Sequence, residues 1–116
     1  MPLSLNDRQA LALWHGTLTE VVRRDAPDLS ARQLAILLAV YRDPPPHTVR
    51  GLAAGLRISK PAVVRALDSL GRHGLVRRKR DDADRRNVLV QRTVKGSVFL
   101  SDFADLIVRA ARDAGA

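Results

Sequence analysis

The middle of the chain is rich in arginine and lysine. Between His47 and Gly96 the sequence holds thirteen basic residues and four acidic ones, a net charge of +9, whereas the whole 116-residue chain carries +8. Guanidinium and ammonium groups bind phosphate, and arginine can also donate two hydrogen bonds to the edge of a guanine. These residue types, gathered in one stretch, therefore indicate a polyanionic partner.

One group of basic residues falls on a segment with helical periodicity. Apolar residues recur between positions 63 and 70 at the spacing of one helix face, so we expect a helix that begins after Ser59 and stops at Gly74. Its outward face would present side chains to a DNA groove. The expected DNA-contact residues on and beside this helix are Arg57, Ser59, Lys60, Pro61, Val64, Arg65 and Arg72.

These candidates have different expected roles. Ser59 and Lys60 would hold a phosphate through the cap hydroxyl, the charge and the free backbone donors of the first turn. Arg65 is suited to bidentate contact with guanine. Val64 would touch a thymine methyl group, or is a tolerated surface residue. Taken alone, this helix could also be an ordinary amphipathic helix with a solvated charged face.

A second group of basic residues flanks an expected hairpin. Four cations occupy positions 77–80 and two more occupy positions 85 and 86, with a polar turn between them. Arg85 at the tip fits a narrow minor groove, where the negative potential is enhanced. Arg78 and Arg86 are the other expected DNA-contact residues of the hairpin. Alternatively, three aspartates at 81, 82 and 84 pair with these arginines, and the charges of the hairpin serve only its solubility. Three acids cannot neutralise six bases, however.

The remaining pattern predicts a mainly helical chain with one small β-hairpin. Helices are expected at 5–25, capped by Ser4 or Asn6, then at 31–42 with a Ser30/Gln33 capping box, at 49–56 with Thr48 as cap, and at 94–114 after Thr93. Strands are expected at 75–80 and 87–92. This order is that of a winged helix-turn-helix in a single domain, 1–116, with the helix-turn-helix at 48–74 and the wing at 75–93.

At these residues the sequence resembles the MarR family of winged-helix transcription regulators. The resemblance lies in Leu52-Ala53, positions 58–70, positions 74–78, the run Asp81-Asp82-Ala83-Asp84-Arg85-Arg86, positions 87–90, Thr93 and Gly96. It implies binding of double-stranded DNA as a homodimer, usually at a palindrome, and most often repression. It also implies an ion pair between Asp68 and Arg86, which would leave Arg85 for the groove. Many relatives release DNA when a small aromatic acid binds, but no inducer is assigned here.

The sequence departs from the family pattern at three places. Arg57 stands where the family often has glycine, so the turn before the recognition helix could be shaped differently, and Arg92 stands where the family has leucine. Family members commonly continue into another C-terminal helix, whereas this sequence stops at Ala116. We therefore expect dimerisation through the helices at 5–25 and 94–114, or through a different interface. The expected interface residues are Leu11, Trp14, Phe99, Phe103, Leu106 and Ile107; alternatively, the helix at 31–42 covers this apolar face.

Other kinds of chemistry have little support in the sequence. Cysteine is absent, there is one glutamate, and the three histidines are scattered, so we expect no enzyme, no metal and no cofactor. We expect no membrane association and a cytoplasmic protein. Two alternatives to a DNA-binding regulator remain: a winged-helix module whose basic face binds an acidic protein, and an enzyme acting on small anionic substrates.

Overall fold

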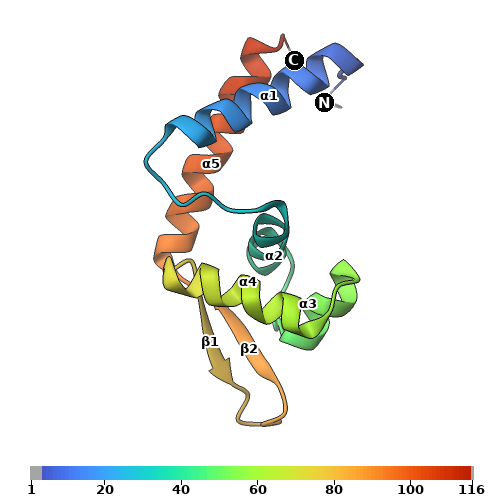
Figure 1. Ribbon diagram of the computed structural model, residues 1–116, viewed down its shortest axis with the longest axis vertical. Coiled ribbons are helices and arrows are strands. Elements are labelled where there is room, and N and C mark those ends of the chain that lie inside the picture. The colour runs from blue at the N-terminus through green and yellow to red at the C-terminus, as the bar shows by residue number, and fades with distance from the viewer. Residues whose placement is uncertain (1–3, 116) are drawn as a thin grey trace. The chain divides into compact units, whose positions relative to one another are not determined.

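The computed structural model describes residues 4–115, and its elements follow the expected order (Figure 1). Within residues 4–115, five helices and a two-stranded antiparallel hairpin make a mainly helical winged helix-turn-helix, which confirms the expected fold class. The ends of the expected 1–116 domain, residues 1–3 and 116, lie outside the described residues. The bounds are α1 (Asp7–Arg23), α2 (Ala31–Arg42), α3 (Val49–Leu56), α4 (Lys60–Arg72), β1 (Val76–Arg80), β2 (Val88–Arg92) and α5 (Val94–Asp113).

The chain divides into two compact units. Unit 1 contains the residues up to Asp28 and those from Phe99 onward, and unit 2 contains Leu29–Val98. The winged helix-turn-helix elements from α2 to β2 all belong to unit 2, together with the first turn of α5. No helix within residues 4–115 is long and apolar enough to cross a membrane.

Side-chain caps fix where the first helices start. Asn6, one of the two expected caps, accepts a hydrogen bond from the Gln9 backbone N–H at 2.8 Å, and the Gln9 side chain bonds back to the Asn6 N–H. Ser30 and Gln33 make the expected capping box in the same way. These bonds satisfy backbone donors that have no partner inside the helix. Because Asn6 takes the cap and Arg24 is extended, α1 is shorter at both ends than the expected 5–25.

The core of unit 2 lies between α2 and α4. Ile36, Leu37 and Val40 of α2 are fully buried, as are Val63, Leu67 and Leu70 of α4. Burial of such side chains contributes about 1.5–3 kcal/mol each to folding. The apolar face of α4 is therefore buried in the core, and the opposite face of that helix is available for other contacts.

The hairpin is tied to the helices by a third extended segment that the sequence analysis did not anticipate. Thr48, just before α3, pairs with Leu89, and the Val90 N–H donates to the His47 carbonyl at 2.8 Å. Within the hairpin, Val76 lies opposite Arg92 and Arg80 lies opposite Val88. Both strands begin one residue later than expected. The base of the hairpin is thus held by the segment that leads into the helix-turn-helix.

A single tyrosine joins the places where the hairpin enters and leaves the helical body. The Tyr41 hydroxyl on α2 donates to the Leu75 carbonyl at 2.7 Å and accepts a hydrogen bond from the Thr93 N–H at 2.8 Å. Thr93 caps α5 by accepting the Gly96 N–H, as expected. A side chain at position 96 would collide with the Tyr41 hydroxyl and the Leu75 carbonyl. This cluster, called here the Tyr41 junction, explains the Thr-x-x-Gly spacing.

Arg92 strengthens the same region. Its guanidinium donates to the Val40 carbonyl at 2.8 Å and to the Asp43 carbonyl at 3.0 Å, so it supplies hydrogen bonds to the end of α2. A cation is also favoured at the negative end of a helix dipole. The strand β2 therefore continues through Arg92, and the departure from leucine does not shorten it.

In unit 1, α1 and α5 run in opposite directions and cross (Figure 1). The Gln9 side chain bonds the Gly115 carbonyl near one end, and the Arg24 guanidinium lies 5.6 Å from the centre of the Phe99 ring near the other. Between these ends, a side chain at Gly16 would lie 3.4 Å from the Ala110 methyl group, so the small residue lets the helices approach closely.

Candidate nucleic-acid interface

The turn that leads into α4 adopts the shape that glycine would give it. Arg57 has φ 56° and ψ 45°, the left-handed conformation, which costs a non-glycine residue roughly 1–2 kcal/mol. The Ile58 N–H donates to the Ala53 carbonyl at 3.1 Å, so the turn closes on the end of α3. The departure from the family glycine leaves a left-handed turn in place and adds an exposed cation beside α4.

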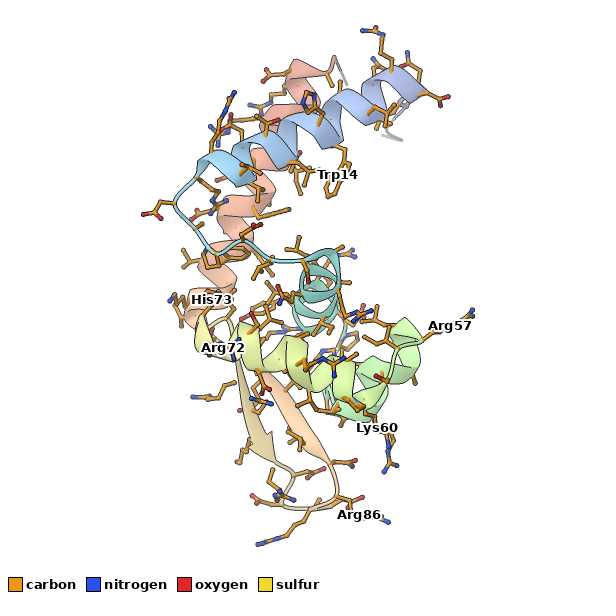
Figure 2. All side chains as sticks on the ribbon, viewed as in Figure 1. Trp14, Arg57, Lys60, Arg72, His73 and Arg86 are labelled. Atoms are coloured by element: carbon orange, nitrogen blue, oxygen red, sulfur yellow. The ribbon has the colours of Figure 1, made fainter. Side chains whose placement is uncertain are left out.

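The first turn of α4 combines a side-chain cap with an exposed cation. The Ser59 hydroxyl oxygen accepts the Ala62 N–H at 3.2 Å, and Pro61 occupies the first turn, where its missing donor has no cost. Lys60 and Pro61 are exposed. Figure 2 shows Arg57 and Lys60 near this turn and Arg72 near the opposite end of α4.

The outward face of α4 is open along its length. Arg65 and Arg72 are exposed, and Val64 keeps 37% of its surface accessible, while its neighbour Val63 is fully buried. The helix period explains this separation, since residues three and four apart share a face. All the candidates expected on this helix and beside it lie on the exposed side: Arg57, Ser59, Lys60, Pro61, Val64, Arg65 and Arg72.

The expected ion pair between Asp68 and Arg86 is wrong. Asp68 pairs instead with Arg78 on β1, with a nitrogen–oxygen distance of 2.7 Å. β1 follows α4 directly, so Arg78 reaches the carboxylate from the near strand, whereas Arg86 belongs to the far end of the hairpin. The link between the recognition helix and the wing exists, but a different arginine makes it.

Arg86 is held by the turn itself. Its guanidinium makes two bonds to the Asp84 carboxylate, at 3.0 and 3.1 Å, and its backbone N–H makes a third at 3.1 Å. These side-chain and backbone hydrogen bonds lower the pKa of the Asp84 carboxyl below its ordinary value of 3.8, with a further contribution from the charge of Arg50. The carboxylate in turn raises the pKa of Arg86. Arg86 nevertheless remains exposed at the end of the hairpin (Figure 2).

Arg85 differs from its neighbour. Its side chain is exposed and makes no hydrogen bond or ion pair with any residue in the described range 4–115. The tip does not fold back onto the helices of unit 2, since the hairpin extends away from α4 (Figure 1). The expected groove-binding arginine is therefore accessible.

The residues expected at a dimer interface fall into two groups. On α1, Leu11 keeps 71% and Trp14 keeps 50% of their surface accessible. On α5, Phe103 and Leu106 are buried within the single chain, and Phe99 and Ile107 are half-buried. Leu18 and Val22, which share the apolar periodicity of this helix but were not among the expected interface residues, extend the exposed apolar side of α1. Counted from Leu11, the positions i, i+3, i+7 and i+11 place these residues on the same face as Leu11 and Trp14.

The structure offers no support for a metal site. Among the described residues, no group of three or more histidine, cysteine or acidic side chains is placed to hold an ion. The Nε2 atom of His47 lies 3.0 Å from the Asp43 carbonyl, which is a structural contact beside the hairpin base.

A comparison with protein-family models identifies one family. The model of the MarR family matches residues 28–87, which is more than half of the chain. A sequence comparison with curated proteins finds no match. Among solved structures, a MepR variant from S. aureus is 19% identical with a TM-score of 0.75, covering 90% of this chain and 74% of that one.

Two further structures are similar. A MarR transcriptional regulator from Methanosarcina mazei Go1 is 25% identical with a TM-score of 0.65, covering 88% of this chain and 69% of that one. The overoxidized form of AbfR bound to DNA is 20% identical with a TM-score of 0.66, covering 87% of this chain and 70% of that one.

Proposed function

Because the chain belongs to the MarR family and is a DNA-binding transcriptional regulator, we propose that it acts as a homodimeric repressor that reads a palindromic site. The observation that carries this proposal is the pairing of two exposed basic surfaces in unit 2. One is the outward face of α4 and the other is the tip of the wing. An α-helix fits the major groove of duplex DNA, and an arginine-bearing loop fits the adjacent minor groove.

Each candidate residue then has a role in binding DNA. Arg65 donates to a guanine edge from the middle of α4, and Arg85 enters the minor groove. Lys60, through its charge, and Ser59, through the hydrogen of its hydroxyl, hold a phosphate at the start of α4. Arg57 and Arg72 add phosphate contacts at its two ends. Arg78 and Arg86, which are occupied by Asp68 and Asp84, serve mainly to hold the wing in place.

The proposed dimer uses the apolar side of α1. Leu11, Trp14, Leu18 and Val22 lie one above another on this helix, and each keeps between 39% and 78% of its surface accessible. A continuous apolar stripe of this kind is characteristic of an intermolecular contact. A symmetric dimer places two copies of α4 on one duplex, which matches a palindromic site. Occupation of such a site at a promoter excludes polymerase, and this is the mechanism of repression we propose.

Selection from a pool of random duplexes, together with a mass measurement of the free protein, tests the proposal. We expect an enriched palindromic motif, a dimer mass, and an affinity that falls steeply with salt because phosphate contacts release counterions. If the selection returns no motif and the protein still binds an acidic protein partner, the DNA-reading function is overturned in favour of a protein-binding module.

A further inference from the structure

The tip of the wing, residues 81–87, is ordered by its own short-range hydrogen bonds. The Asp81 N–H donates to the Asn87 carbonyl at 3.1 Å, and the Asn87 N–H donates to the Asp84 carbonyl at 2.9 Å. The carboxylates of Asp81 and Asp84 accept the backbone N–H groups of Ala83 and Arg86, respectively. Aspartate side chains commonly stabilise turns in this way. The tip is therefore a built turn that holds its residues in fixed directions.

One further bond reaches the tip from the strand. The guanidinium of Arg80, the last residue of β1, donates to the backbone carbonyl of Arg85 at 2.6 Å. A hydrogen bond with a charged donor is stronger than one between neutral groups. It fixes the peptide between Arg85 and Arg86 from its carbonyl end, while the N–H of the same peptide donates to the Asp84 carboxylate.

The two faces of the hairpin use their cations differently. The strand period places Arg78 and Arg80 on one face, with Val88 and Val90 opposite them, and places Arg77 and Lys79 on the other. On the first face, Arg78 pairs with Asp68 and Arg80 bonds the Arg85 carbonyl. Within residues 4–115, the side chains of Arg77, Lys79 and Arg85 make no such bond.

We propose that Arg80 is a positioning residue of the wing, which aims Arg85 into the DNA groove by holding its carbonyl and does not itself contact DNA. This inference rests on the proposed DNA-reading function and adds a supporting residue that neither the sequence pattern nor the family resemblance indicates. It follows that the charge of Arg80 matters little to binding, whereas its bond to residue 85 matters through the direction that it gives to the neighbouring side chain.

A double-mutant cycle with Arg80→Ala and Arg85→Ala tests this dependence. In the otherwise unchanged protein, Arg80→Ala is expected to lower affinity for the selected duplex by about 5- to 10-fold; in the Arg85→Ala protein it is expected to lower affinity less than about 2-fold. Lys79→Ala is the matched control, since it removes one cation from the same strand. We expect its effect to be the same in both backgrounds.

The salt dependence of binding supplies a readout that a loss of folding would not imitate. Removing a phosphate contact reduces the slope of log K against log salt by about 0.9. In the Arg85→Ala background, Arg80→Ala should leave this slope unchanged. Without DNA, amide exchange at Arg86 and Asn87 should become faster in Arg80→Ala. If Arg80→Ala lowers the melting temperature, Arg80→Met takes its place in the cycle, because methionine keeps the aliphatic part of the side chain and removes only the guanidinium.

Several results would overturn the positioning role. These are an Arg80→Ala effect that is equal in both backgrounds, an Arg80→Ala protein that binds like wild type, and an Arg85→Ala protein that binds like wild type. An unmodified protein that binds no duplex would instead overturn the proposed function, and the amide-exchange comparison would then still report whether Arg80 holds the tip.

Discussion

The two units of the chain expose opposite kinds of surface. Unit 2 buries its apolar side chains between α2 and α4 and exposes cations on α4 and the hairpin. Unit 1 buries Phe103, Leu106 and Ala110 of α5 and still leaves an apolar stripe exposed along α1. A charged surface and an apolar surface suit different partners, because phosphate attracts cations and apolar area drives association away from water.

The difference also lies in how firmly each surface is held. In unit 2 the hairpin is fastened at its base by the Tyr41 junction, at its middle by Asp68–Arg78 and at its tip by Asp84–Arg86. The stripe in unit 1 needs no such fastening, since a regular helix already aligns its side chains. Reading DNA requires individual groups at fixed positions, whereas an apolar contact tolerates variation in detail.

The largest expected effect comes from placing a charge on the apolar stripe. Leu18→Glu would bury two carboxylates in the proposed symmetric interface, at a cost of at least ~3 kcal/mol. We expect a monomer by mass measurement and a large loss of affinity for the palindromic duplex. Ala12→Glu makes the same charge change on another side of α1 and should remain dimeric. A dimeric Leu18→Glu protein would remove α1 from the interface.

The second-largest expected effect comes from a substitution that overfills the Tyr41 junction. Gly96→Ala forces a methyl group into the Tyr41 hydroxyl and the Leu75 carbonyl, and overpacking of this kind costs about 1–3 kcal/mol of folding free energy. Urea denaturation measures the loss. Gly71→Ala on α4 is the control, because nothing lies within 4 Å of the added methyl, and it should be neutral or stabilising. Equal stabilities for the two variants would contradict the junction.

On the charged surface, Arg65→Ala should cost ~1–3 kcal/mol of binding free energy and relax the preference for one base. The effect is confined to DNA binding, since Arg65 is exposed and its loss leaves the core intact. Titration of wild-type and mutated duplexes measures both changes. Arg32→Ala, which removes an exposed arginine from α2, is the control and should keep the base preference. Unchanged discrimination in Arg65→Ala would remove this residue from base recognition.

The smallest expected effect concerns pH. Because the pKa of the Asp84 carboxyl is lowered in the folded protein, its stabilising contribution is present above the ordinary value of 3.8 and is lost as pH falls through the lowered folded pKa. The stabilising contribution of Asp84 to the tip should therefore be about the same at every pH between 8 and 5. The amide resonance of Arg86, followed by NMR, checks this. A transition near pH 6 would show that another group controls the turn.

Local features of the fold were predictable, and distant ones were not. The bounds of α2 and α3 and their caps follow from Ser30, Gln33 and Thr48, because a capping bond joins residues only three positions apart. The Tyr41 hydroxyl instead meets residues 34 and 52 positions further along the chain. No local pattern specifies such a contact, since it depends on how whole elements pack.

The candidate site shows the same division. The outward face of α4 follows from helical periodicity, so the exposure of Arg65 and the burial of Val63 could be foreseen. Which arginine meets Asp68 depended on the register and reach of the two strands, and here the expectation of Arg86 was wrong. The bond from Arg80 to a backbone carbonyl has no sequence signature at all.

The placement of the aromatic residues gives each unit its own optical reporter. The chain contains one tryptophan and one tyrosine, and they lie in different units. Trp14 is half-exposed on the stripe of α1, so its fluorescence emission should shift to the blue when a second copy covers it. The ultraviolet absorbance of Tyr41 should change only when the hydrogen bonds of its hydroxyl break. Dissociation of the proposed dimer and melting of the winged region can therefore be followed separately in one unlabelled sample.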